Sequence, residues 1–232
     1  MKPPRGILVA HRTQYAAYLG LGAVILALVS LADQTPFRRF LGSLDPRLVV
    51  VAVLLVNAAA LGYLLTTGAF SIYRRTGYRG WLLFAALAGG FGAVVIAADA
   101  IIIFPRETNV FFPQSLLFYP VMAMLVEAAW HGVPMSLLVL LLSRFRGVNI
   151  RRSSWFLVPL VALTDPVFQV IDMVAVTPWG ATLFVGVHVY LINLVEMILF
   201  RGHSFIAAFA FRLFYYLIWH VIWGYVRLTV LF

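Results

Sequence analysis

Residues 48–67 read Leu-Val-Val-Val-Ala-Val-Leu-Leu-Val-Asn-Ala-Ala-Ala-Leu-Gly-Tyr-Leu-Leu-Thr-Thr. The run carries no charged side chain, and a helix needs about 20 apolar residues to cross the hydrocarbon core of a bilayer. Comparable apolar runs lie at 13–32, 80–104, 114–142, 154–176, 180–200 and 204–226. The sequence therefore predicts an all-α polytopic membrane protein with about seven transmembrane helices, six and eight being the alternatives.

The composition of the whole chain supports the same fold class. Its 232 residues are 63% hydrophobic and 11% charged, against roughly 45–50% and about 25% in soluble domains. A soluble protein of this composition would expose a large apolar patch. We therefore exclude a soluble enzyme, a disordered tail and a nucleic-acid module, and treat residues 1–232 as a single transmembrane domain in contact with the lipid bilayer. Because the chain has no cysteine, thiolate and disulfide chemistry are excluded as well.

The formal net charge of +9 comes from arginines beside the apolar runs, not from a surface for nucleic acid. The N-terminal segment and the second and fourth loops hold Lys2, Arg5, Arg12, Arg74, Arg75, Arg79, Arg144, Arg146, Arg151 and Arg152. The alternate loops hold only Arg38, Arg39, Arg47 and Arg106. Since cytoplasmic loops carry the excess of Lys and Arg, we expect a cytoplasmic N-terminus in a bacterial inner membrane. Seven spans would then place the C-terminus outside.

Prolines predict irregular backbone in two of the runs. Pro134 falls within 114–142, and Pro159 and Pro166 fall within 154–176. Because proline lacks an amide hydrogen and clashes with the preceding turn, we expect kinks at these positions.

Ionisable side chains inside the apolar runs are the main chemical signal. An ionised group at mid-membrane costs about 2.5–3.5 kcal/mol on insertion scales, so each needs a partner or a wet cavity. The nine candidates are Asp99, Glu127, His131, Asp165, Asp172, His188, Glu196, Arg212 and His220.

The spacing of these residues groups them on helix faces. Glu127 and His131 stand four residues apart, which places both on one face. This spacing suits a carboxylate and an imidazole that share a metal or a proton, and it also suits an interhelical hydrogen-bonded pair. Further along, Arg212, Tyr216 and His220 form a stripe with the same spacing. The stripe should face the bundle interior, where Arg212 could equally neutralise a carboxylate such as Glu196.

Two other runs contribute secondary candidates. Asp165 and Gln169 share a face, and Asp172 follows on roughly the same side. They are interpreted as ligands, as proton carriers or as polar groups that satisfy the kink. His188 and Glu196, eight residues apart, align loosely on one helix. For Asp99, near the end of its run, we expect the membrane interface or an arginine partner.

The stretch 114–232 resembles the CPBP (Abi) family of CaaX-prenyl-protease-like glutamic intramembrane peptidases. The family has three motifs, each of which can be aligned with a segment of this chain. Glu-Glu-x-x-x-Arg aligns with Val126-Glu127-Ala-Ala-Trp-His131, and Phe-x-x-x-His aligns with Asp165-Pro-Val-Phe-Gln169. His-x-x-x-Asn/Asp aligns with His220-Val-Ile-Trp-Gly224. The order of the motifs and the spacing within them agree with the family, whereas several of the residue types differ. A second alignment places the first motif on Glu196-Met-Ile-Leu-Phe-Arg201 and the second on Tyr216-Leu-Ile-Trp-His220.

The resemblance implies an intramembrane endopeptidase in which a glutamate activates water. The residues it marks as catalytic are Glu127, His131, His220, Asp165 and Gln169, and Glu127, His131 and His220 could also hold a divalent zinc or iron ion. The substrate or partner would be a membrane protein or peptide. There are three alternatives. The protein could be an inactive homologue, or a non-catalytic membrane subunit or scaffold that binds a partner or lipid. It could also be a haem or metal protein that uses His131, His188 and His220 as ligands.

Overall fold

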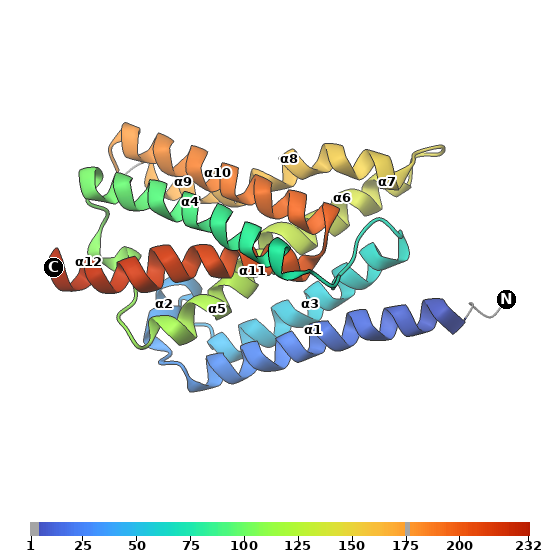
Figure 1. The fold of residues 1–232 in the computed structure, drawn as a ribbon, viewed down its shortest axis with the longest axis horizontal. Helices are drawn as coiled ribbons and strands as arrows, with labels where there is room; N and C mark the ends of the chain where they lie inside the picture. The colour runs from blue at the N-terminus through green and yellow to red at the C-terminus, as the bar shows by residue number, and fades with distance from the viewer. Residues whose placement is uncertain (1–4, 175–176) are drawn as a thin grey trace.

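The computed structural model describes the backbone of residues 5–174 and 177–232, and the side chains of these residues except 5–11 and 172. It is a bundle of helices (Figure 1), and no β-strand occurs in these ranges. Among the described residues, seven helices are long and apolar enough to cross a membrane, as predicted: Arg12–Leu31, Pro46–Thr66, Tyr78–Ile102, Ser115–Ser143, Ile150–Ile171, Trp179–Gly202 and Phe205–Val230. The chain is therefore an integral membrane protein.

Four of these spans are built from one long helix each. They are α1 (Arg5–Leu31), α3 (Pro46–Thr66), α4 (Tyr78–Ile102) and α10 (Trp179–Gly202). A short α2 (Thr35–Leu41) and a 3₁₀ turn (Arg106–Thr108) lie in the connections. Asp45 caps α3 by accepting a hydrogen bond from the Arg47 amide at 2.8 Å, and Pro46 follows at the first helical position.

The other three spans change their helical geometry on the way through the membrane. The fourth consists of α5 (Ser115–Val126), a π-helical turn (η2, Glu127–Gly132) and α6 (Val133–Ser143). The fifth consists of α7 (Ile150–Ser153), a 3₁₀ turn (Ser154–Phe156), α8 (Leu157–Ala162) and α9 (Thr164–Met173). The last consists of α11 (Phe205–Tyr216), a second π-helical turn (η4, Leu217–Trp223) and α12 (Gly224–Val230). Such π-helical turns are frequent at functional sites.

Two prolines act at these irregular segments as the sequence predicts. In a regular α-helix the Trp130 carbonyl would accept from the amide of residue 134, but Pro134 has none, and the Thr164 hydroxyl donates to this carbonyl at 2.8 Å instead. Pro166 likewise leaves the Ala162 carbonyl without its α-helical donor, and the Asn193 amide group lies 3.5 Å from it. Pro159 stands within α8 without a break. Side chains from neighbouring spans thus satisfy the backbone that the prolines release.

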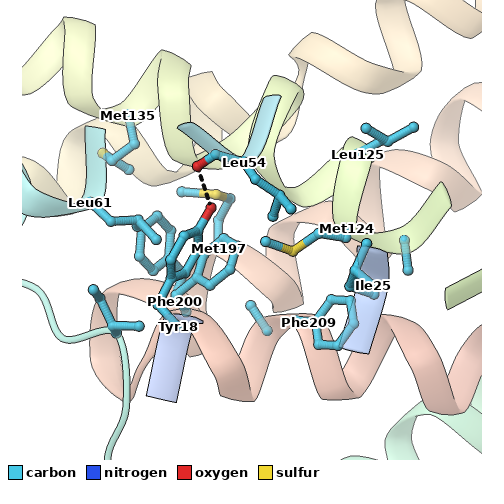
Figure 2. Packing of buried hydrophobic residues seen from close by; sticks show 14 of the residues in the cluster. Tyr18, Ile25, Leu54, Leu61, Met124, Leu125, Met135, Met197, Phe200 and Phe209 are labelled. Carbon is cyan, nitrogen blue, oxygen red and sulfur yellow. Dashed lines mark hydrogen bonds between the residues drawn. The ribbon is translucent and has the colours of Figure 1, made fainter. Parts of the chain in front are cut away.

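The interior and the outer surface of the bundle differ as expected for a protein in lipid. Figure 2 shows Tyr18 donating a hydrogen bond to the Leu54 carbonyl, at 2.8 Å, among packed side chains such as Met197 and Phe200. Large apolar side chains such as Leu55 and Phe156 point outward instead. Because no water is present in the hydrocarbon core, outward apolar side chains are favourable there.

The two termini lie at opposite ends of the bundle (Figure 1). The N-terminal end also holds the connections after α3 and α6, which carry Arg74, Arg75, Arg144 and Arg146. The C-terminal end holds the connection between α4 and α5. The segments with most arginines therefore gather at one end.

Candidate functional site

The centre of the site is the Glu127–His131 pair in the π-helical turn η2. His131 Nδ1 and Glu127 Oε2 lie 2.9 Å apart, and both residues are 0% exposed. The two side chains therefore share a face, as their spacing of four residues predicts. Their contact is a carboxylate–imidazole hydrogen bond shielded from solvent.

Arg212 of α11 joins this pair to two other spans. Its Nε donates to Glu127 Oε1 at 2.8 Å, and its Nη2 donates both to Glu196 Oε2 and, at 2.8 Å, to Asn193 Oδ1. Glu196 and Asn193 stand on α10. The side chain of Arg212 is only 4% exposed. The contact with Glu196 is the pairing that the sequence suggested as the alternative to a catalytic role for Arg212.

A third carboxylate, Asp165 of α9, completes the arrangement. Its Oδ1 accepts a hydrogen bond from Gln169 Nε2 at 2.9 Å. Its Oδ2 accepts one from Asn193 Nδ2 at 3.2 Å, and Arg212 Nη1 lies 3.7 Å from the same oxygen. We call this set the buried polar cluster. Its members are Glu127, His131, Asp165, Gln169, Asn193, Glu196 and Arg212.

The buried polar cluster has more acidic than basic side chains. Three carboxylates, from Glu127, Asp165 and Glu196, face one guanidinium. A protonated His131 would still leave the carboxylates in excess. Two buried atoms of this cluster, His131 Nε2 and Glu196 Oε1, have no hydrogen-bond partner among the described residues. Because uncompensated buried charge is costly, three ionised carboxylates in this cluster would require an additional proton or cation.

A cavity of about 360 Å³ lies beside this cluster. It is bordered by α4, α9, α10, α11 and η4, and residues of the connections after α4 and α9 also line it. Asp165, Gln169, Asn193 and Arg212 form the part of its wall that belongs to the cluster. Glu127, His131 and Glu196 are not among the lining residues, so they lie behind this wall.

His220 lies in the same cavity wall but apart from Glu127 and His131. Its ring stacks on Tyr119 with 4.4 Å between the centroids, and its Nδ1 lies 3.4 Å from the Asn109 amide nitrogen. The sequence grouped His220 with Glu127 and His131, and the structure separates them. The reason is that His220 follows Arg212 by eight residues, about 12 Å along a helix.

His188 lines the cavity as well, at a third place. Its ring stacks on Phe184, and its Nε2 lies 3.4 Å from the Tyr215 hydroxyl. The three histidines proposed as haem or metal ligands are therefore held by different neighbours. Within the ranges that the structure describes, the group whose ligand atoms all lie within 4.8 Å is Glu127, His131 and Glu196.

The remaining candidates have separate environments. Asp99 accepts from Arg227 Nε at 2.7 Å and from Trp223 Nε1 at 2.8 Å, which gives it the arginine partner that the sequence suggested. Arg201, the last residue of the second motif alignment, donates to Ser154, the Ala69 carbonyl and the Arg151 carbonyl, away from Glu196. The side chain of Asp172 lies outside the described residues.

Sequence reasoning did not select Asn193, which donates to Asp165 and accepts from Arg212. An amide inside an apolar helix was the available signal. The sequence prediction also missed Arg227. Only ionisable residues inside the apolar runs were considered, and Arg227 follows the run that ends at 226.

No protein-family model matches the chain, and no curated protein or solved structure matches it either.

Proposed function

We propose that this protein is an intramembrane hydrolase that cleaves peptide bonds, a divergent member of the CPBP-like peptidases. Glu127 is the base that takes a proton from water, and His131 is its partner. One observation carries this proposal: Arg212 donates to Glu127 and also lines the cavity, so a single guanidinium connects the shielded Glu127–His131 pair with the space that can hold a substrate.

The proposed reaction uses the groups on both sides of Arg212. A water molecule that enters beside Arg212 would give its proton to Glu127 while its oxygen attacks the peptide carbonyl carbon, and the proton would then pass to the leaving amine. Arg212 would hold the Glu127 carboxylate in position beside the cavity through its 2.8 Å hydrogen bond. Asp165 and Gln169 would orient the substrate, and His220 would contact it at the other end of the cavity.

Glu127→Gln is expected to abolish peptide hydrolysis while the protein still folds. The loss of a general base lowers a rate by about 10²–10⁴-fold. Folding should survive, since Arg212 keeps Glu196 and Asp165 as partners. The assay uses purified protein in nanodiscs with a library of transmembrane peptides, and thermal unfolding reports folding.

A matched control for this variant is Glu107→Gln, which removes an exposed carboxylate in the connection after α4. It should hydrolyse peptides at the wild-type rate. Undiminished hydrolysis by Glu127→Gln would refute the assignment of the base. If wild-type protein that is correctly folded cleaves no peptide of the library, the hydrolase proposal fails in favour of a non-catalytic membrane subunit or scaffold.

A second candidate function is the binding of a divalent metal ion by Glu127, His131 and Glu196. The two unpartnered atoms, His131 Nε2 and Glu196 Oε1, support this candidate, and nitrogen and oxygen donors suit zinc or iron. We expect about one ion for each chain by elemental analysis, and loss of that ion in Glu196→Gln. Metal-free wild-type protein after purification without chelator would exclude this candidate and leave water activation to Glu127 alone.

The arginines support a proposal for the orientation of the protein. The N-terminal end of the bundle, which holds most of them, is proposed to face the cytoplasm of a bacterial cell across its inner membrane. The cavity, lined by Pro105 and Thr108 of the connection after α4, would then be reached from the outer side.

A further inference from the structure

We propose that the cavity between α4, α9, α10 and η4 binds a lipophilic organic cation, a small molecule with a substituted ammonium group next to an apolar group. The volume of about 360 Å³ lies in the range of small-molecule sites, about 300–1,000 Å³. This binding does not require hydrolysis at Glu127. It rests on three properties of the cavity, namely the charge behind its wall, its aromatic lining and the occupation of its donors.

The charge behind the wall favours a cation. Asp165 lines the cavity and is 3% exposed, and Glu127 and Glu196, both fully buried, stand behind it. Within the described part of the chain these three carboxylates share one basic side chain that is always charged, Arg212. Electrostatic attraction is strong where water is scarce. A positive ligand in the cavity would therefore lie beside the Asp165 carboxylate, in a region with more acidic than basic side chains.

The aromatic lining provides a second interaction with a cation. Five aromatic side chains border the cavity: Phe104, Phe184, Tyr215, Tyr216 and Trp219. A quaternary ammonium group over such ring faces is attracted by the negative charge that the aromatic ring carries on its face. Aliphatic side chains also line the cavity and suit the apolar part of the ligand: Val95, Val185, Val189 and Ile192.

The donors at the cavity wall are already occupied, which disfavours an anion. Arg212 uses Nε for Glu127 and Nη2 for Asn193 and Glu196. Its Nη1 lies 3.5 Å from the Tyr216 hydroxyl and close to Asp165. An anionic ligand would have to displace one of these partners and approach the Asp165 carboxylate. A quaternary ammonium group forms no hydrogen bonds, so it displaces none of these partners, and the one opposing charge at the wall is that of Arg212, which is shared among three carboxylates.

The cavity is reachable at the C-terminal end of the bundle. Pro105, which lines it, is exposed, and Thr108 and Thr177 are partly exposed. These residues belong to the connections after α4 and α9. We therefore expect a ligand to enter from this end.

The test compares ligands that share a shape and differ in charge. Phenyltrimethylammonium is the cation, tert-butylbenzene its neutral isostere and benzenesulfonate the anion. Binding to wild-type protein in nanodiscs is measured by titration calorimetry, with empty nanodiscs as the blank. We expect the Kd of the cation to be at least about tenfold lower than that of either other ligand. Equal affinity for the isostere, preference for the anion, or no binding of the cation would each overturn the proposal.

Two variants separate the charge from the rings. Asp165→Asn should weaken binding of the cation at least about tenfold and leave the isostere nearly unaffected. Phe184→Leu changes a partly exposed side chain outside the buried polar cluster, so the protein should fold, and it should reduce the preference for the cation over the isostere. The control is Asp33→Asn, which removes an exposed carboxylate that does not line the cavity. This variant should bind the cation as the wild type does. A preference that persists in Asp165→Asn and in Phe184→Leu alike would contradict the proposed site.

Discussion

Arg212→Met should lower the free energy of unfolding by about 3–5 kcal/mol, the range expected when one partner of a buried ion pair is removed. The physical reason is the charge balance of the buried polar cluster. Without Arg212, the carboxylates of Glu127 and Glu196, both 0% exposed, face each other with no cation between them. Thermal unfolding of the purified protein in detergent should show a drop in Tm on the order of 10 °C.

A compensating variant makes this expectation specific. Combining Arg212→Met with Glu127→Gln and Glu196→Gln removes the charges that Arg212 neutralises, so much of the lost stability should return. A mutant cycle compares the change in the free energy of unfolding of the combined variant with the sum of the changes of the single variants. The difference is the interaction energy between the substituted side chains. If the triple variant is less stable than Arg212→Met alone, the role of Arg212 is packing and not charge neutralisation.

Asp99→Asn is expected to destabilise the protein by a similar amount, about 3–5 kcal/mol. Asp99 is the carboxylate bonded to Arg227, and both side chains are 0% exposed. The guanidinium also donates to the Phe104 and Pro105 carbonyls and to Asn109 Oδ1. Since these acceptors carry no net charge, Arg227 would remain as an uncompensated buried cation. The measurement is the same thermal unfolding experiment.

Comparing the stability of Asp99→Asn with that of Glu127→Gln tests whether the number of carboxylates around a buried arginine determines the effect. Both substitutions replace a fully buried carboxylate that contacts an arginine by the isosteric amide. Arg212 retains two further carboxylates and Arg227 retains none, so Asp99→Asn should be much more destabilising than Glu127→Gln. Equal effects of the two variants would mean that the number of carboxylates around each guanidinium does not determine stability.

The spans could be predicted from the sequence because hydrophobic length is a local property. The run 48–67 becomes α3, Pro46–Thr66, and its start is marked by a capping Asp45 followed by Pro46. The Glu127–His131 contact was predictable for the same reason, since residues four apart on a helix meet whatever the helix packs against.

The assembly of the site could not be predicted in this way. Arg212 and Glu127 are 85 residues apart in sequence, and their contact depends on how α11 packs against the fourth span. The same packing decides that Glu196, and not His220, lies beside His131: its Oε2 is 4.0 Å from His131 Nδ1. The polar stripe of Arg212 and His220 was read correctly as inward-facing, but a stripe extends along a helix and its two ends reach different partners.

The hydrogen bond from Thr164 to the Trp130 carbonyl makes two distant positions depend on each other during evolution. The bond gives the Trp130 carbonyl a donor that Pro134, which has no amide hydrogen, cannot supply. A descendant chain that replaced Pro134 by another residue would regain the local donor, and selection for a hydroxyl at 164 would relax. Conversely, a chain that first lost the hydroxyl would gain from losing the proline. Positions 134 and 164 should therefore be inherited as a pair, although they belong to different spans.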